Sequence, residues 1–180
     1  MARPRSTNGQ ACQRRQQRGY GLPPGGFLNT YFDTGVLLKV YVQELNSAEA
    51  IALVSKIAPP IPFTHFHTIE LFTAIRLKRF RAEINANEEK TAIQVLRADI
   101  TNERLQLPDY DLLQLFRRAE VLSDKYAAIF GTRTLDILHV AAALEAECTE
   151  FVSFDERQRK VAAKERLTVV PHQLQKQSKP

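Results

Sequence analysis

Short segments with strand character alternate with longer segments of helical periodicity along most of the chain, and this alternation is its most constraining feature. Strands are predicted where aromatic and β-branched residues cluster beside turn signals, at residues 27–32, 61–66, 104–107, 151–154 and 167–170. Helices are predicted where apolar residues recur at helical spacing, at residues 36–41, 47–58, from about 68, and over 87–100, 109–129, 134–147 and 156–165. Such alternation favours parallel βαβ units. The sequence therefore predicts an α/β fold, a three-layer α/β/α sandwich with a mainly parallel sheet.

The two ends of the chain differ in composition from the segment between them. Residues 1–26 contain five arginines and no acidic residue, so this segment carries the whole net charge of +5 and residues 27–180 sum to zero. It has few large apolar side chains, and such a segment buries too little surface to offset its ordering entropy. We expect a disordered basic extension over 1–26, one folded domain over 27–170 and a polar C-terminal tail over 171–180.

Charge and motif content exclude several classes of protein. The folded segment is not basic, which argues against a broad cationic surface for nucleic acid. Two cysteines, Cys12 and Cys148, are too few for a disulfide scaffold or a four-cysteine zinc site. No apolar run approaches the ~18 residues of a membrane span, so we expect a cytoplasmic protein without membrane association. The phosphate-binding signatures G-x-x-x-x-G-K-[ST] and G-x-G-x-x-G do not occur in the positions that nucleotide binding requires.

Four acidic residues lie where predicted strands end or where the following helices begin. Asp33 and Asp155 end two strands, Glu70 stands just beyond a third, and Asp136 lies in the first turn of a helix for which Thr134 is a candidate cap. Ligands of an open parallel sheet bind at the carboxyl ends of its strands. We therefore expect these four side chains to converge on one pocket at that edge.

Each acid taken alone has a simpler explanation. Acidic residues favour helix N-termini, and Asp155 with Gln158 fits a D-x-x-Q capping box. Four clustered carboxylates, however, repel one another and need a positive charge to offset them. Oxygen donors without clustered cysteine or histidine suit Mg²⁺ or Mn²⁺. Such an ion activates a water for attack on phosphorus and stabilises the leaving oxygen, so the acids point to phosphate chemistry.

Four sequence blocks carry a resemblance to a known family. They are YFDTGVLLKVYVQE at residues 31–44, HTIELFTAIRLKR at 67–79, TRTLDILHVAAAL at 132–144 and FVSFDERQRKVAAKERLTVV at 151–170. In these blocks and in this order the chain resembles PIN-domain ribonucleases, and most closely the VapC-like toxins of type II toxin–antitoxin systems. The resemblance places the family's acids at Asp33, Glu70, Asp136 and Asp155, and its common histidine at His139.

The resemblance implies a PIN-like nuclease domain over residues 27–170. It implies endonucleolytic cleavage of single-stranded or looped RNA with Mg²⁺ or Mn²⁺, a homodimer, and inhibition by a cognate antitoxin. We expect all four acids, Asp33, Glu70, Asp136 and Asp155, to hold the ion directly or through water. Asp33 and Asp136 are the expected direct ligands, and Glu70 or Asp155 is a candidate to position the attacking water instead. A non-catalytic RNA- or protein-binding module on the same scaffold is the alternative, although a binder has little need for clustered acids.

Other polar residues near the acids have two interpretations each. Arg76 and Arg79, with Lys78 and Arg81, either bind RNA phosphates or form a solvated helix face. His139 lies three residues after Asp136, hence on the same helical face, and either hydrogen-bonds a ligand carboxylate or is a structural histidine. Ser153 either orients a water or is an ordinary strand hydroxyl. His65 and His67 alternate like a metal pair, but no third ligand is evident, so we do not expect zinc there.

Overall fold

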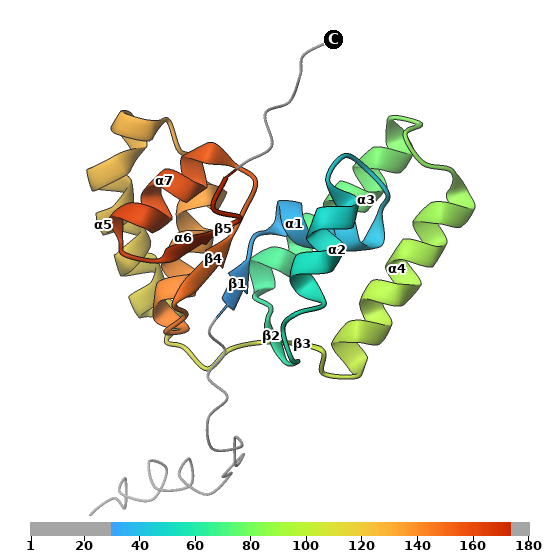
Figure 1. The fold of residues 1–180 in the computed structure, drawn as a ribbon, viewed down its shortest axis with the longest axis horizontal. Coiled ribbons are helices and arrows are strands. Elements are labelled where there is room, and N and C mark those ends of the chain that lie inside the picture. The colour runs from blue at the N-terminus through green and yellow to red at the C-terminus, as the bar shows by residue number, and fades with distance from the viewer. Residues whose placement is uncertain (1–29, 174–180) are drawn as a thin grey trace, which may run out of the picture.

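The computed structural model describes residues 30–173, which form five short strands and seven helices in that range (Figure 1). The strands are β1 (Thr30–Phe32), β2 (Ile61–Pro62), β3 (Leu105–Gln106), β4 (Glu150–Val152) and β5 (Thr168–Val170). The helices are α1 (Thr34–Tyr41), α2 (Ser47–Val54), α3 (His65–Phe80), α4 (Ala86–Thr101), α5 (Leu112–Phe130), α6 (Thr134–Glu145) and α7 (Glu156–Lys164). The predicted extension over 1–26 and most of the predicted tail lie outside the described residues.

All strand pairings in the described range are parallel. One sheet has the order β1-β4-β5 and the other pairs β2 with β3, and β1 lies against β2. Tyr31 faces Phe151 across the β1–β4 pairing, and Phe151 faces Val169 across the β4–β5 pairing. The prediction of an α/β fold with a parallel sheet flanked by helices is confirmed.

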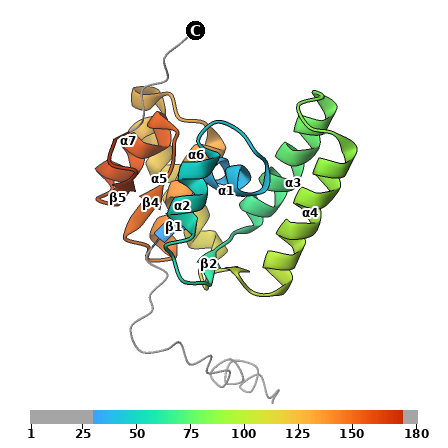
Figure 2. The same cartoon turned by 45° about the vertical axis from the view of Figure 1, so that its right-hand side comes forward.

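The strands separate two hydrophobic cores, because successive strand side chains point to opposite faces. Tyr31 and Phe151 pack with residues of α5, α6 and α7, whereas Phe32 and Val152 pack with residues of α1, α3 and α4. Figure 1 shows this division, with α5 to α7 on one side and α1 to α4 on the other, and in both views α3 and α4 lie side by side away from α7 and β5 (Figures 1 and 2). The two faces of β1 and β4 are therefore covered at Tyr31, Phe32, Phe151 and Val152, and the C-terminal ends of these two strands are where a polar site can form.

Several element boundaries differ from those predicted. The strand predicted over 61–66 ends at Pro62, and α3 begins at His65 rather than near Thr68. The reason is a cap that the apolar pattern does not reveal: Thr64 N–H donates to His67 Nδ1 at 2.9 Å, and the Thr64 hydroxyl accepts from His67 N–H at 3.4 Å. Hydrogen bonds of this kind satisfy the free N–H groups of the first helical turn.

The sequence favours Ser47 and Thr134 as the N-caps of the helices predicted over 47–58 and 134–147, and both predictions are wrong. Asn46 precedes α2 in a left-handed conformation and Ser47 is the first helical residue; the Ser47 hydroxyl instead accepts from Glu44 N–H at 2.9 Å. That helix ends at Val54, four residues before the predicted end. In α6 the cap position is Arg133, and Thr134 is the first helical residue.

Among residues 30–173, no helix combines the length and apolar character that crossing a bilayer requires.

Glu44, in the connection between α1 and α2, joins two helices through lysines. Its carboxylate oxygens each lie 2.8 Å from a lysine Nζ, one of Lys39 on α1 and one of Lys78 on α3. Partial burial by itself raises the pKa of Glu44, but the hydrogen bonds and charges of the two lysines outweigh it and lower this pKa overall. The ionised form is therefore favoured in the folded state.

This lowered pKa predicts a pH-dependent contribution to stability. The contribution is present above the unfolded-state pKa, near 4.5, and is lost as the pH falls through the lower folded-state value. Glu44→Gln should lower the free energy of unfolding by about 0.5–1 kcal/mol at pH 7 and by progressively less below pH 4.5. Urea titrations across pH 3–7 test this. Glu120→Gln, at an exposed α5 position without an ion pair in the described residues, is the control; equal losses in both variants would contradict the prediction.

Candidate functional site

Asp33 lies at the end of β1 and caps α1. One carboxylate oxygen accepts a hydrogen bond from Val36 N–H at 2.7 Å, and the other accepts from the Ser153 hydroxyl at 2.5 Å. The pairing of Phe32 with Val152 explains the second contact, because it brings the next residue of each strand to the same edge. Asp33 is only 4% exposed. This burial raises the pKa of Asp33, although the hydrogen bonds from Ser153 and Val36 counteract it.

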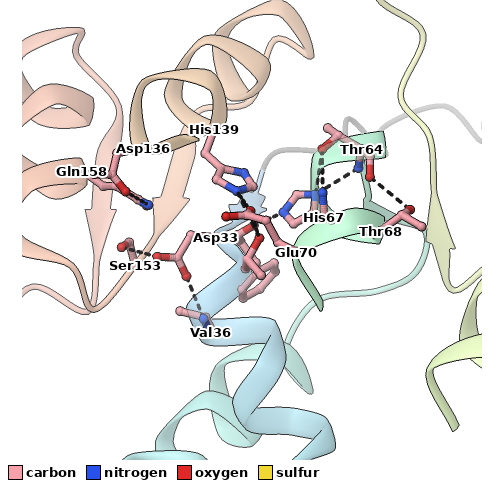
Figure 3. A network of polar contacts seen from close by, with 12 residues as sticks. Asp33, Val36, Thr64, His67, Thr68, Glu70, Asp136, His139, Ser153 and Gln158 are labelled. Atoms are coloured by element: carbon pink, nitrogen blue, oxygen red, sulfur yellow. Dashed lines mark hydrogen bonds and ion pairs between the residues drawn. The ribbon is translucent and has the colours of Figure 1, made fainter. Parts of the chain in front are cut away.

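Glu70, in the second turn of α3, is held by α1 and α6 (Figure 3). Its Oε2 accepts from the Thr34 hydroxyl and from His139 Nε2, both at 2.5 Å. Because a carboxylate only accepts, Nε2 of His139 carries a proton. Nδ1 of His139 lies 2.9 Å from the Tyr31 hydroxyl. Burial by itself raises the pKa of Glu70, but the hydrogen bonds from His139 and Thr34 and the charge of His139 lower it overall.

Asp136 and Asp155 each lie at the start of a helix. Asp136 Oδ2 accepts from Arg133 N–H at 2.8 Å in the first turn of α6, and Asp155 Oδ1 accepts from Arg157 N–H at 2.7 Å and Gln158 N–H at 3.2 Å in α7. The expected capping box is only half formed, because the backbone N–H of Asp155 does not donate to the Gln158 side chain but to the Ser153 hydroxyl. Instead, the Gln158 side chain donates to Asp136 Oδ1 at 3.0 Å (Figure 3). Gln158 thus connects two of the four acids.

Short links join all four acids at the carboxyl ends of β1 and β4. Ser153 donates to Asp33 and accepts from the backbone N–H of Asp155 at 3.0 Å. Gln158 continues the path from Asp155 to Asp136, and His139, one turn further along α6, reaches Glu70. The negative charge of Asp155 raises the pKa of Asp33 and the positive charge of His139 lowers it, which also reflects their proximity.

The model of the PIN domain family matches residues 30–164, which is more than half of the chain. The chain belongs to the PIN domain family. No curated protein matches it. PIN domains are typically metal-dependent nucleases, and they generally use divalent metal ions.

The acids of this PIN domain provide donors that suit a hard dication. In the described part of the chain, Asp33, Asp136 and Asp155 form no ion pair with lysine or arginine, and the side-chain partners of Glu70 are His139 and Thr34. The described residues contain no three His, Cys, Asp or Glu side chains close enough to hold an ion as they stand. Mg²⁺ is usually held by one or two carboxylates and keeps several waters. The set therefore fits an ion bound directly by few of these acids and through water by the others.

Arg76 and Arg79, which are predicted to bind RNA phosphates, lie on α3 with Glu70 but closer to the C-terminal end of that helix. Arg76 is exposed, donates to Phe72 O at 3.2 Å and lies with its guanidinium 5.5 Å from the centre of the Phe72 ring. Arg79 is nine residues after Glu70, which at about 100° per residue turns it to the opposite side of α3. Arg76, six residues after Glu70, is turned from it by about 120° on the same count, so it lies closer to the Glu70 side than Arg79 does. The role of both arginines in RNA binding stays a prediction.

His67 belongs to the core of the PIN domain and not to a metal site. Its Nδ1 accepts from Thr64 N–H, so the proton is on Nε2, which donates to Phe32 O at 2.8 Å. Burial lowers the pKa of His67 well below its usual value, with the charge of His139 adding to this. His65 is exposed.

Cys148 is buried, and this burial raises the pKa of its thiol to about 12. A thiol with so high a pKa is unreactive, because the thiolate is the nucleophile.

The sequence singles out the four acids, His139 and Ser153, and the structure connects them by hydrogen bonds through groups that the sequence does not single out. Thr34 and Tyr31 support the Glu70–His139 pair, and Gln158 supports Asp136. Thr34 and Tyr31 flank the Phe32–Asp33 pair in the first block, so their position was a usable signal. The sequence contains no signal for the contact between Gln158 and Asp136, because this contact depends on how α7 packs against α6.

Burial of Asp33 without a cationic partner predicts that stability increases when its charge is removed. Asp33→Asn should raise the free energy of unfolding of the metal-free protein by about 1 kcal/mol at pH 7, as often happens when a functional charge is neutralised. Chemical denaturation in EDTA measures this. The exposed Asp124→Asn on α5 should change stability by no more than about 0.5 kcal/mol. A clear loss of stability in Asp33→Asn would contradict the prediction, because it would mean that the carboxylate of Asp33 stabilises the folded protein.

Proposed function

We propose that the chain is a Mg²⁺- or Mn²⁺-dependent endoribonuclease that acts as the toxin of a toxin–antitoxin pair. The observation that carries the proposal is Asp33, a buried carboxylate without a cationic partner in the described residues, linked to three further acids at one edge of the sheet. A carboxylate in that position costs free energy, which a bound dication offsets. Membership of the PIN domain family supports nuclease chemistry.

The proposed roles follow from how each acid is held. Asp33 and Asp136 would bind the ion directly, because each is oriented through both carboxylate oxygens. Glu70 or Asp155 would orient the attacking water. When bound, the ion activates water and stabilises negative charge on the phosphate. His139 and Thr34 favour the ionised form of Glu70 and fix its direction, and Ser153 with the backbone N–H of Val36 fixes the direction of Asp33.

The substrate and the biological role are the finer part of the proposal. Four blocks, at residues 31–44, 67–79, 132–144 and 151–170, resemble those of VapC-like toxins in sequence and in order. This supports RNA as the substrate, and it supports a homodimer that a cognate antitoxin inhibits. The exposed Arg76, on the helix that carries Glu70, is the first candidate for contact with an RNA phosphate.

One observation favours the alternative of a non-catalytic binding module. Within residues 30–173 the side chains as they stand form no ready three-ligand metal group. A binding module predicts RNA or protein binding that is independent of metal and is not followed by cleavage. A nuclease predicts that an added dication draws the carboxylates together and that cleavage depends on it.

Cleavage of RNA tests the proposal directly. The wild-type chain should cut single-stranded or stem–loop RNA internally with Mg²⁺ or Mn²⁺ and not in EDTA. Asp33→Asn should lower the rate by about 100-fold or more, because it removes a direct ligand. Asp124→Asn, an exposed change on α5, should cut normally. Undiminished cleavage by Asp33→Asn, in a preparation free of other nucleases, would refute the mechanism.

The toxin role makes a separate prediction in cells. Induced expression of the wild-type chain in bacteria should arrest growth, because cleaved RNA cannot support translation. Asp33→Asn should leave growth unchanged at the same expression level, and Asp124→Asn should arrest it. Growth curves with immunoblots measure this. Equal arrest by Asp33→Asn would mean that toxicity does not come from the acidic site.

A further inference from the structure

Gln158, in the first turn of α7, contacts two of the acids at once. Its backbone N–H donates to Asp155 Oδ1 at 3.2 Å, and its side-chain Nε2 donates to Asp136 Oδ1 at 3.0 Å. The residue is only 7% exposed. A glutamine that is this buried normally uses both ends of its amide.

The carbonyl end of this amide has no partner among the described residues. Oε1 of Gln158 is one of three buried side-chain polar atoms there without a hydrogen bond. Turning the amide over does not remove the problem, because a carboxylate oxygen only accepts and therefore requires the NH₂ group at Asp136. A buried carbonyl oxygen without a donor costs roughly 1–3 kcal/mol. A hydrogen-bond donor that arrives with a ligand would recover this free energy.

A neutral amide also suits the charge of its surroundings. Asp33, Asp136 and Asp155 already gather negative charge at this edge, and another carboxylate at position 158 would repel them. Gln158 instead holds Asp136 by donation, while Arg133 N–H holds the other oxygen of that carboxylate. Asp136 is thus oriented by two donors, neither of which cancels its charge.

We propose that Gln158 is a positioning residue of the metal site, which fixes Asp136 beside Asp155 and offers its carbonyl oxygen to the hydration shell of the ion. The inference rests on the proposed function, since it assumes that the acids bind a dication. Mg²⁺ loses its waters reluctantly, so a water of the ion is the donor that Oε1 lacks. The amide lies against Asp136 (Figure 3), which places the carbonyl oxygen next to a predicted ligand.

Metal binding by variants of the full chain tests this inference. Gln158→Met keeps the length of the side chain and removes both the donor and the acceptor. It should raise the dissociation constant for Mn²⁺, measured by isothermal titration calorimetry, about tenfold or more. Gln114→Met, at an exposed position of α5, should bind Mn²⁺ as the wild type does. A purely structural role for Gln158 would lower the unfolding temperature of the metal-free protein and leave the dissociation constant unchanged.

A second measurement uses the wild-type chain and does not depend on how a variant folds. Addition of Mg²⁺ should shift the side-chain amide resonances of Gln158 in ¹⁵N spectra and leave those of Gln114 in place. Wild-type affinity in Gln158→Met, or unmoved Gln158 resonances in a protein that binds Mg²⁺, would overturn the inference and leave the proposed function standing. Absence of Mn²⁺ binding by the wild type would overturn both.

Discussion

The parallel pairing of β1 with β4 is the constraint on which the site depends. These strands are 120 residues apart in the sequence, as the Asp33–Ser153 hydrogen bond shows, and their register sets those two residues side by side. Asp33 then lies against the helix that follows β1, and Ser153 lies against the turn that begins α7. A shift of one residue in this register would send Tyr31 and Phe32 to the wrong cores and would separate Asp33 from Ser153.

The groups that orient the acids are nearly all neutral. Backbone N–H groups hold Asp33, Asp136 and Asp155, and the side chains of Ser153 and Gln158 add further donors. Neutral donors fix the direction of a carboxylate and leave its charge available. Arginine or lysine in the same places would have given a set of ordinary ion pairs. Glu70 is held by side chains of two other helices, and the hydrogen bonds from His139 and Thr34 lower its pKa despite its partial burial.

The sequence predicted the layout because that layout follows from local periodicity. Short apolar strands between amphipathic helices predicted the α/β class, and the position of the acids at strand ends predicted the edge at which they lie. Boundaries failed where a polar contact decides them, as at the Thr64–His67 cap of α3. The D-x-x-Q pattern predicts that Gln158 forms half of a capping box with Asp155; its backbone N–H does so, but its side chain contacts Asp136 instead. The sheet order β1-β4-β5, which is not sequential, decides which side chains meet, and no local pattern reports it.

Whether Asp33, Glu70, Asp136 and Asp155 together bind one hard dication is tested most directly by anomalous diffraction from crystals soaked in Mn²⁺, because the signal locates the ion without reference to activity. We expect a peak at the carboxyl ends of β1 and β4, within about 2.5 Å of oxygens of Asp33 and Asp136. A well-soaked crystal with no peak at this edge, or with manganese bound only elsewhere, would contradict it.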